Sequence, residues 1–309
     1  MTLDYFVADV FTNQIFSGAQ IAVFPNADDL TDEQMTLISR EINLWETVFI
    51  FKPTNNDATR KMRVFSPRGV EIDFAGHPLI AAAFVLGETG VVDTSQENVS
   101  ITVQQNSGDI DVSISSTDGK VTFVQFAKTV SSVIDRYTPS ATEIAKFLGI
   151  DADDIDHNKY STRLVSCGYP YLIVPVWNYA AVRKAKFDYA AWSHSAGPQT
   201  AAQEILLFSP KTPHVDSDFH VRLLGPNIGI NDDPPVGSVT PSFAAYLCSF
   251  DITQLGTHAF SVCRGDAAVR RSVINVEMDN KKKPDLALRI GGEAVMVSEG
   301  RMHIPAKAS

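Results

Sequence analysis

The sequence predicts a two-domain protein in which strands and helices are mixed. Its 309 residues are about twice the length of a typical domain, which is roughly 150 residues. Segments with the two-residue period of strands are interspersed with a few segments of helical period. Near Ser161 the pattern of the first half begins again, and such an internal duplication predicts two similar domains.

The first half is expected to open with two strands, residues 3–11 and 19–24, joined by the turn "TNQIFSG". A helix is expected over residues 30–42, because Thr31 and Gln34 stand in capping-box positions. Its buried face would carry Leu30, Met35, Ile38 and Ile42. The segments that follow are the strands "ETVFIFK" and "KMRVFSP", an alanine-rich helix, the strands "VSITVQQ", "DIDVSIS" and "VTFVQF", and a second capped helix, "SATEIAKFLGI".

The duplication is clearest around the alanine-rich helix. The first-half segment "RKMRVFSPRGVEIDFAGHPLIAAAFVL" matches "FHVRLLGPNIGINDDPPVGSVTPSFAAYL", so Gly76-His77 corresponds to Gly237-Ser238. Pro78 suits the first helical position, which would place Gly76 and His77 at the positive end of a helix. Two such ends facing one cleft would bind a carboxylate or phosphate. Two ordinary helix caps are the alternative.

Glu46 is a candidate for proton transfer. It begins a strand and shares a face with Leu44, Val48 and Ile50. A carboxylate on an apolar face is unfavourable unless it is paired, and a withdrawn carboxylate can take a proton and return it. Spacing alone favours a plainer interpretation, a glutamate at the end of a strand with its carboxylate in water.

Asp233 and His77 are further candidates. Two prolines after Asp233 would hold its loop extended near Ser238. Asp-Pro is also a common start of a turn, and on sequence alone Asp232 is an equal candidate. His77 could act as an acid or base, bind a carboxylate, or cap the helix.

Composition narrows the functional classes. A net charge of −10 argues against a nucleic-acid surface, and the one basic run, Lys281 to Lys283, is typical of a solvated loop. The longest apolar run is too short to span a membrane and no signal-peptide pattern opens the chain, so we expect a cytoplasmic protein. Nucleotide-binding motifs and a Gly-x-Ser-x-Gly motif are absent from the sequence.

No metal is expected either. The three cysteines are scattered, and the histidines other than His77 show no metal-ligand spacing. We therefore expect these six histidines at surface or hydrogen-bonded positions: residues 157, 194, 214, 220, 258 and 303.

Several motifs in order along nearly the whole chain resemble those of the PhzF-like phenazine-biosynthesis proteins, which share the diaminopimelate-epimerase fold. They are "DVFT", "SGAQIAVF", "REINLWETVFIF", "RVFSP", "FAGHPLIAAA", "NDDPPVGSVTPSFAAYL" and "RIGGEAVMVSEGRM". The resemblance implies an α+β fold of two pseudo-symmetric domains, each a mostly antiparallel β-sheet or barrel around a central α-helix. We place the domains at residues 1–128 and 129–309, with the last strand, near 295–309, a candidate to return to the first domain.

The resemblance also implies an activity. Members of this family isomerise or epimerise small carboxylated substrates, which are cyclic or derived from amino acids. The resemblance implies that the substrate binds between the two domains, that no cofactor is needed, and that the protein forms a homodimer. Glu46 matches the family's acid/base, and His77 and Asp233 match its other catalytic positions, which decides against Asp232. The residues that fall at substrate-binding positions are Gly76, Gly237, Ser238, Gln20 and Trp45. The related epimerases use two cysteines, but neither loop contains one here, so the resemblance implies carboxylate chemistry.

The chain departs from the family pattern at several positions. Ala19, Trp45 and Val236 stand where the family has asparagine, serine and threonine, and "RGDAAVRRS" replaces the usual "Q-G-x-x-M-G-R-P-S". These changes predict a substrate other than the dihydro-hydroxyanthranilate of the namesake enzyme. Two alternatives stay open: elimination or ring closure after the same deprotonation, and a binding protein without catalysis.

Overall fold

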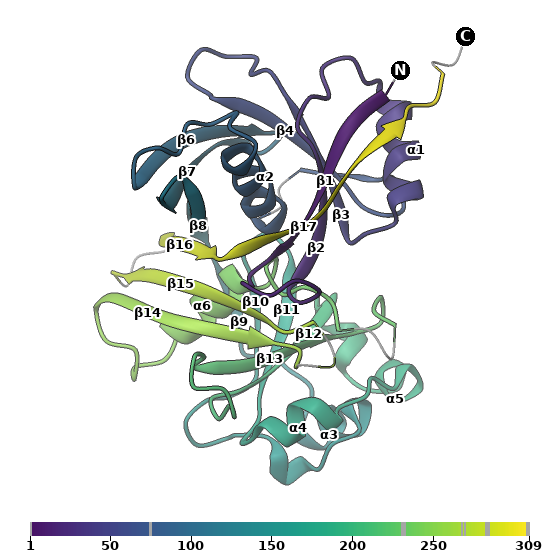
Figure 1. Ribbon diagram of the computed structural model, residues 1–309. Coiled ribbons are helices and arrows are strands. Elements are labelled where there is room, and N and C mark those ends of the chain that lie inside the picture. The colour runs from purple at the N-terminus through teal and green to yellow at the C-terminus, as the bar shows by residue number, and fades with distance from the viewer. Residues whose placement is uncertain are drawn as a thin grey trace. The chain divides into compact units, whose positions relative to one another are not determined.

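The computed structural model describes residues 2–73, 76–229, 233–266, 268, 270–281 and 285–306. The chain divides into two compact units (Figure 1), which we describe one at a time. Unit 1 consists of Met1–Lys128 and Arg289–Ser309, and unit 2 consists of Thr129–Leu288. Within the described ranges, no helix is both long enough and apolar enough to cross a bilayer.

Unit 1 contains a mostly antiparallel sheet. β2 pairs with β3 and β4 with β6 in parallel, whereas β1–β2, β3–β4, β4–β5, β6–β7 and β7–β8 are antiparallel. The strands are β1 (Thr2–Val10), β2 (Ala19–Phe24), β3 (Glu46–Phe51), β4 (Arg60–Phe65), β5 (Glu71–Ile72), β6 (Asn98–Gln105), β7 (Gly108–Thr117), β8 (Lys120–Ser131) and β17 (Ala294–His303).

The central helix of unit 1 is α2 (Gly76–Glu88). Every residue from Gly76 to Gly87 is buried, and the helix contacts β1, β2, β3, β7 and β17 (Figure 1). A helix that is apolar on all sides is stable only when protein surrounds it. The alanine-rich sequence of α2 therefore fits its buried place against these five strands.

The outer helix of unit 1 is α1 (Asp32–Ile42). Thr31 and Gln34 form the predicted capping box, and Met35 and Ile38 are buried in a cluster with Phe24. The predicted buried face is confirmed, because Leu30 belongs to the same cluster and Ile42 packs against it.

The last strand of the chain lies in unit 1. β17 pairs antiparallel with β1 along its whole length, from Thr2 opposite His303 to Val10 opposite Ala294, with one irregularity between Val7 and Ala8. The end of the chain thus covers the edge that β1 would otherwise expose.

Unit 2 repeats the strand pairing of unit 1. Its successive pairs β10–β11, β11–β12, β12–β13, β13–β14 and β14–β15 alternate antiparallel and parallel, as do the pairs from β1–β2 to β6–β7 in unit 1. Unit 2 contains β9 (Val133–Asp135), β10 (Arg163–Ser166), β11 (Pro170–Pro175), β12 (Glu204–Ser209), β13 (Phe219–Leu224), β14 (Gly256–Arg264) and β15 (Ser272–Asn280); β16 (Asp285–Gly292) leads back into unit 1.

The helices of unit 2 also contribute buried residues to its hydrophobic core. α6 (Thr240–Cys248) is the counterpart of α2 and is buried from Thr240 to Leu247. α3 (Ala141–Leu148) has the predicted capping box of Ser140 and Glu143. The short helices α4 (Tyr179–Lys184), α5 (Tyr189–Ser193), η1 (Ala152–Asp154) and η2 (Gly197–Gln199) were not expected from the sequence. The α+β class with a central helix in each unit is confirmed.

The two central helices begin differently from the prediction. α2 starts at Gly76, so Pro78 is its third residue rather than its first. α6 starts at Thr240 with Val239 as its cap residue, so Gly237 and Ser238 lie in the turn before the helix. The matched dipeptides therefore do not occupy the same helical position. The reason is that Pro241, rather than the glycine, sets the first turn of α6.

Candidate active site

The end of α1 positions Glu46. Asn43 adopts a left-handed conformation with φ of 52° and donates its backbone N–H to the carbonyl of Ser39 at 3.0 Å, which ends the helix. The chain then turns into β3, which starts at Glu46 and pairs in parallel with β2, with Ile21 opposite Glu46. The carboxylate is thus fixed to a central strand of unit 1.

Glu46 is paired with His77. Nε2 of His77 lies 2.7 Å from Oε2 of Glu46, and the two side chains are 7% and 15% exposed. The plainer interpretation of Glu46, a solvated glutamate at a strand end, is therefore wrong. His77, the second residue of α2, directs its ring to Glu46 rather than capping the helix.

The second nitrogen of the His77 ring is available for a ligand. Nδ1 is buried and has no hydrogen-bond partner among the described residues. An ionised Glu46 only accepts hydrogen bonds, so Nε2 donates to it, and in a neutral imidazole Nδ1 is then an acceptor. The pair can therefore accept a donor from a bound molecule while the carboxylate is held in place.

Gly76 allows α2 to approach the sheet. A Cβ at this position would lie 2.8 Å from Cζ of Phe126 on β8, closer than real side chains come. A larger residue at position 76 would therefore require the Phe126 ring or the start of α2 to shift.

The residues that directly precede Glu46 in the sequence help to line a small pocket. It has a volume of about 200 Å³ and is lined by Gln20, Asn43, Leu44, Trp45 and Pro67. The side chain of Trp45 is among the exposed large hydrophobic ones, at 40%. Gln20 and Trp45 line this pocket together, and each stands one position before a residue of the Ile21–Glu46 strand pair.

Asp233 lies in unit 2 between two arginines. Its side chain is 2% exposed; Oδ2 accepts a hydrogen bond from Nη1 of Arg183 at 2.6 Å, and Oδ1 lies 3.6 Å from Nε of Arg264. Arg264 also donates to the backbone carbonyls of Asp233 and Pro234. These contacts hold the loop in place through its carboxylate and its backbone. The rival candidate, Asp232, lies outside the described residues.

The side chain of Ser238 contacts a neighbouring strand. Its side chain is hydrogen-bonded to that of Tyr171 on β11, whose pKa is raised above its ordinary value by burial. Val236, which replaces a polar residue of the family pattern, is 1% exposed. The turn from Asp233 to Ser238 is therefore fixed at both ends by side-chain contacts.

Three residues of unit 2 escaped the sequence analysis. Arg183 comes from the unexpected helix α4, and Arg264 stands in the variant segment "RGDAAVRRS" without an assigned role. Glu204 begins β12 opposite Tyr171, and burial raises its pKa to about 7. Nothing in the sequence around Glu204 predicts that it is buried, because its burial depends on the pairing of β12 with β11.

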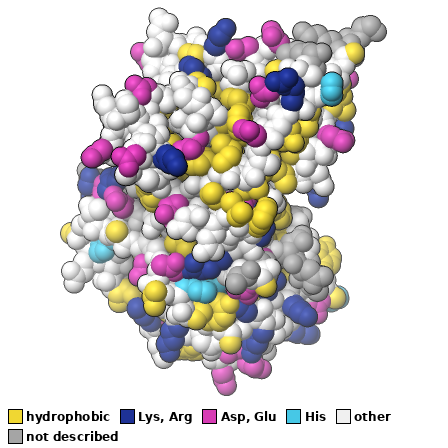
Figure 2. Space-filling view, in the orientation of Figure 1, with side chains coloured by type: hydrophobic (Ala, Val, Ile, Leu, Met, Phe, Trp, Pro, Cys, Tyr) yellow, Lys and Arg dark blue, Asp and Glu magenta, His cyan; other side chains and the backbone are white. Residues whose placement is uncertain are grey.

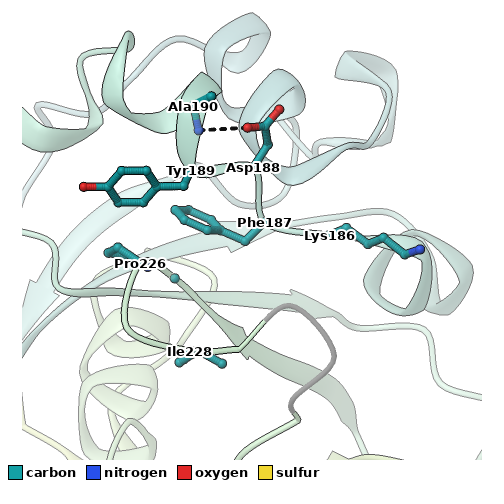
Figure 3. Close-up of a pocket in the computed structure, with 8 residues that line it drawn as sticks. Lys186, Phe187, Asp188, Tyr189, Ala190, Pro226 and Ile228 are labelled. Atoms are coloured by element: carbon teal, nitrogen blue, oxygen red, sulfur yellow. Dashed lines mark hydrogen bonds between the residues drawn. The ribbon is translucent and has the colours of Figure 1, made fainter.

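A larger pocket of unit 2 lies apart from the predicted site residues. It has a volume of about 630 Å³ and is lined mainly by the segment from Lys186 to Ala190 and by Gly225, Pro226 and Ile228 (Figure 3). The carboxylate of Asp188 accepts the amide of Ala190 at 2.9 Å, so it caps α5. None of the predicted site residues lines this pocket.

Charges of both signs are scattered over the visible face of the protein. On the face drawn in Figure 2, Asp and Glu side chains are scattered among Lys and Arg.

The predicted site residues fall into two groups: Glu46, His77, Gly76, Gln20 and Trp45 in unit 1, and Asp233, Gly237 and Ser238 in unit 2. In the first group, Glu46 and His77 are in hydrogen-bond contact, Gly76 precedes His77 in α2, and Gln20 and Trp45 line the small pocket. The second group lies in the segment that leads into α6.

Comparisons with known proteins assign the family. The family model of phenazine biosynthesis-like proteins, PhzC-PhzF, matches residues 8–300. An uncharacterised isomerase of Mesorhizobium japonicum is 31% identical, over 98% of this chain and 99% of its own. The trans-2,3-dihydro-3-hydroxyanthranilate isomerase of Pseudomonas aeruginosa is 24% identical, over 97% and 99%.

A solved structure shows the same fold. The Bacillus anthracis phenazine biosynthesis protein of the PhzF family superposes with a TM-score of 0.83 at 22% identity, covering 98% of this chain and 100% of its own. The order of motifs, the presence of one central helix in each unit and these matches agree. The chain therefore belongs to the phenazine biosynthesis-like (PhzF) family, as an enzyme of the isomerase class.

Proposed function

We propose that this protein is a cofactor-independent isomerase that moves a proton between carbon atoms of a small carboxylated substrate, with Glu46 as the acid/base. The observation that carries the proposal is the 2.7 Å contact between Glu46 and His77, both largely withdrawn from solvent. A general base must be held within hydrogen-bond reach of the proton that it takes. The contact with His77 fixes one carboxylate oxygen and leaves the other for the substrate.

His77 orients the base and binds the substrate. Its Nε2 holds Oε2 of Glu46, and its buried Nδ1 would accept a hydrogen bond from a hydroxyl or amino group of the substrate. Amide groups at the start of α2, including that of Gly76, would stabilise negative charge that develops next to the reacting carbon.

The residues of unit 2 would bind the substrate carboxylate. Gly237 and Ser238 supply a backbone amide and a hydroxyl in the turn before α6. Asp233 is clamped by Arg183 and Arg264, which suits a positioning residue better than a proton shuttle, because its carboxylate is already committed to two cations. We propose that this group and the Glu46 group act on the same substrate molecule.

The substrate differs from the one named for the Pseudomonas aeruginosa relative. Trp45, the residue before Glu46, lines the small pocket, and a pocket of about 200 Å³ with this wall admits a compact, partly apolar group. Ala19 and Val236 each replace a polar side chain of the family pattern. Together these residues favour a carboxylate with fewer polar substituents.

Solvent-isotope exchange tests the proposal. Small cyclic and amino carboxylates would be incubated with the protein in deuterium oxide, and incorporation at carbon measured by mass spectrometry. Glu46→Gln should lower exchange by a factor of roughly 100 to 10,000, as loss of a general acid/base does. Glu41→Gln, on the exposed side of α1, is the matched control and should not change the rate.

The possible outcomes separate the alternatives. Full exchange in Glu46→Gln would contradict the assignment of the base. A deuterated product that has lost a leaving group would indicate elimination, and a cyclic isomer of unchanged mass apart from the deuterium would indicate ring closure. A carboxylate that raises the melting temperature but never exchanges a proton would identify a binding protein.

A further inference from the structure

Three potential metal ligands converge in unit 2: His214, His220 and Cys263. One ring nitrogen of each histidine and Sγ of the cysteine all lie within 4.8 Å of one another. β13 and β14 are parallel, and their register places His220 directly beside Cys263. His214 comes from the loop between β12 and β13. Two neighbouring strands thus fix two ligands, and the preceding loop adds the third.

The histidines of this cluster lack the partners that buried polar groups normally have. His220 is fully buried, yet neither of its ring nitrogens has a hydrogen-bond partner among the described residues, and the same holds for Nε2 of His214. The expectation that these histidines are exposed or hydrogen-bonded is therefore wrong for His220. A buried polar group without a hydrogen-bond partner is unfavourable, because it has lost its contacts with water and gained none. A bound cation would supply the missing partner.

We propose that His214, His220 and Cys263 form a zinc site with three protein ligands and water in the fourth position. Imidazole nitrogen and thiolate sulfur are the donors that Zn²⁺ prefers, whereas Mg²⁺ and Ca²⁺ prefer oxygen. With Zn–N and Zn–S distances of about 2.0–2.3 Å, ligand atoms of a tetrahedral site are about 3.5 Å apart. The three side chains would therefore move inward by about 1 Å or less.

The surrounding charges permit a cation. Arg183 and Arg271 lie close enough to influence these groups, but each has an acidic partner. Arg183 lies 2.6 Å from Asp233 and 3.4 Å from Asp266, and Arg271 is paired with Asp216. Neither arginine is therefore an uncompensated positive charge.

Zinc binding at this site would release one proton from the protein. The buried Cys263 thiol loses one proton to solvent when its sulfur binds zinc, and the two imidazoles bind in their neutral form. The metal would connect the β12–β13 loop to two strands, and this role does not depend on the proposed isomerisation.

Metal titration of the full-length protein tests the site. After treatment with a chelator, the protein would be titrated with ZnCl₂ against a chromophoric competitor, and its melting temperature followed. We expect one zinc ion per chain and a rise in melting temperature, because zinc binds only the folded trio. Co²⁺ in place of zinc should give a sulfur-to-cobalt charge-transfer band in the absorption spectrum.

Variants identify the ligands. His214→Ala should weaken zinc binding more than about 100-fold, since even an outer-shell change costs 10- to 100-fold. Cys263→Ala should abolish the charge-transfer band. The controls are Cys248→Ala, whose sulfur contacts Met278, and His194→Ala on the exposed end of α5; both should bind as the parent does.

Two results would overturn the proposal. One is a parent protein that takes up no zinc at a stoichiometric concentration while its circular dichroism shows it to be folded. The other is zinc binding that persists at full affinity in His214→Ala. Because His214 is only half-buried, this variant is expected to fold even if Cys263→Ala does not.

Discussion

Nε2 of His77 lies 2.7 Å from Oε2 of Glu46, and this contact joins the first turn of the central helix to the start of β3. The two residues are separated by 31 positions, and their contact carries the proposed chemistry. The same ring keeps a buried nitrogen, Nδ1, without a partner in the described part of the chain.

Replacing His77 by leucine should lower proton exchange by roughly 10- to 150-fold. This range corresponds to the loss of about 1.5–3 kcal/mol from a hydrogen bond to a charged group. His303→Leu, an exposed histidine on β17, is the control. Exchange would be measured under saturating substrate, with circular dichroism to check folding. An unchanged rate in His77→Leu would remove His77 from the mechanism.

Trp45 should determine which substrates are accepted. Because its side chain is 40% exposed, Trp45→Ser should change the free energy of unfolding by less than about 1 kcal/mol. The larger pocket should raise the KM for compact apolar carboxylates and lower it for more polar ones. Competition between the two substrate classes would measure this shift; identical selectivity in both proteins would contradict the assignment.

Breaking the Asp233–Arg183 pair should destabilise unit 2. Arg183→Met leaves a carboxylate that is 2% exposed without its closest cation, which typically costs about 3–5 kcal/mol. The neighbouring Lys184→Met removes only the more exposed contacts with Asp151 and Asp154, worth about 0–1 kcal/mol. Urea denaturation would compare the two variants. Equal losses would show that Arg183 does not compensate a buried charge.

Glu204 should make stability fall as pH rises. Burial raises its pKa from 4.5 to about 7 in the folded protein, so the folded state holds a proton that the unfolded state has released. The contribution is fully present below pH 4.5 and is lost as pH rises through about 7. One proton gives a slope of at most about 1.4 kcal/mol per pH unit.

Glu204→Gln tests this dependence. Unfolding free energies between about pH 5 and pH 8 should become flatter in this variant. Glu33→Gln, on the exposed surface of α1, should leave the slope of the parent. The same slope in both variants would assign the effect to another group.

Gly76→Ala should destabilise the protein although alanine favours helices. The new Cβ would lie 2.8 Å from the Phe126 ring, and overpacking of this kind costs about 1–3 kcal/mol. In a Phe126→Leu background the cost of Gly76→Ala should shrink, and a double-mutant cycle would measure the coupling. Zero coupling would mean that Phe126 does not limit the helix.

Local sequence determined the helices that carry their own signals. Thr31 with Gln34 and Ser140 with Glu143 form capping boxes within four residues of chain, so hydrogen bonds between near neighbours decide them. The family motifs likewise identified Glu46 and His77 as candidates before any contact was known. The short helix α4 escaped because six residues carry too little periodicity to be recognised.

Only the tertiary structure decided which side chains meet. From the sequence alone, Glu46 could be a solvated residue at the end of a strand. In the folded protein the start of α2 places His77 against its carboxylate. His220 and Cys263 are 43 residues apart in the sequence and become neighbours through the parallel register of β13 and β14. Contacts of this kind depend on long-range strand pairing and burial, whereas caps and turns depend on adjacent residues, and for that reason the sequence alone could name the candidates but not their partners.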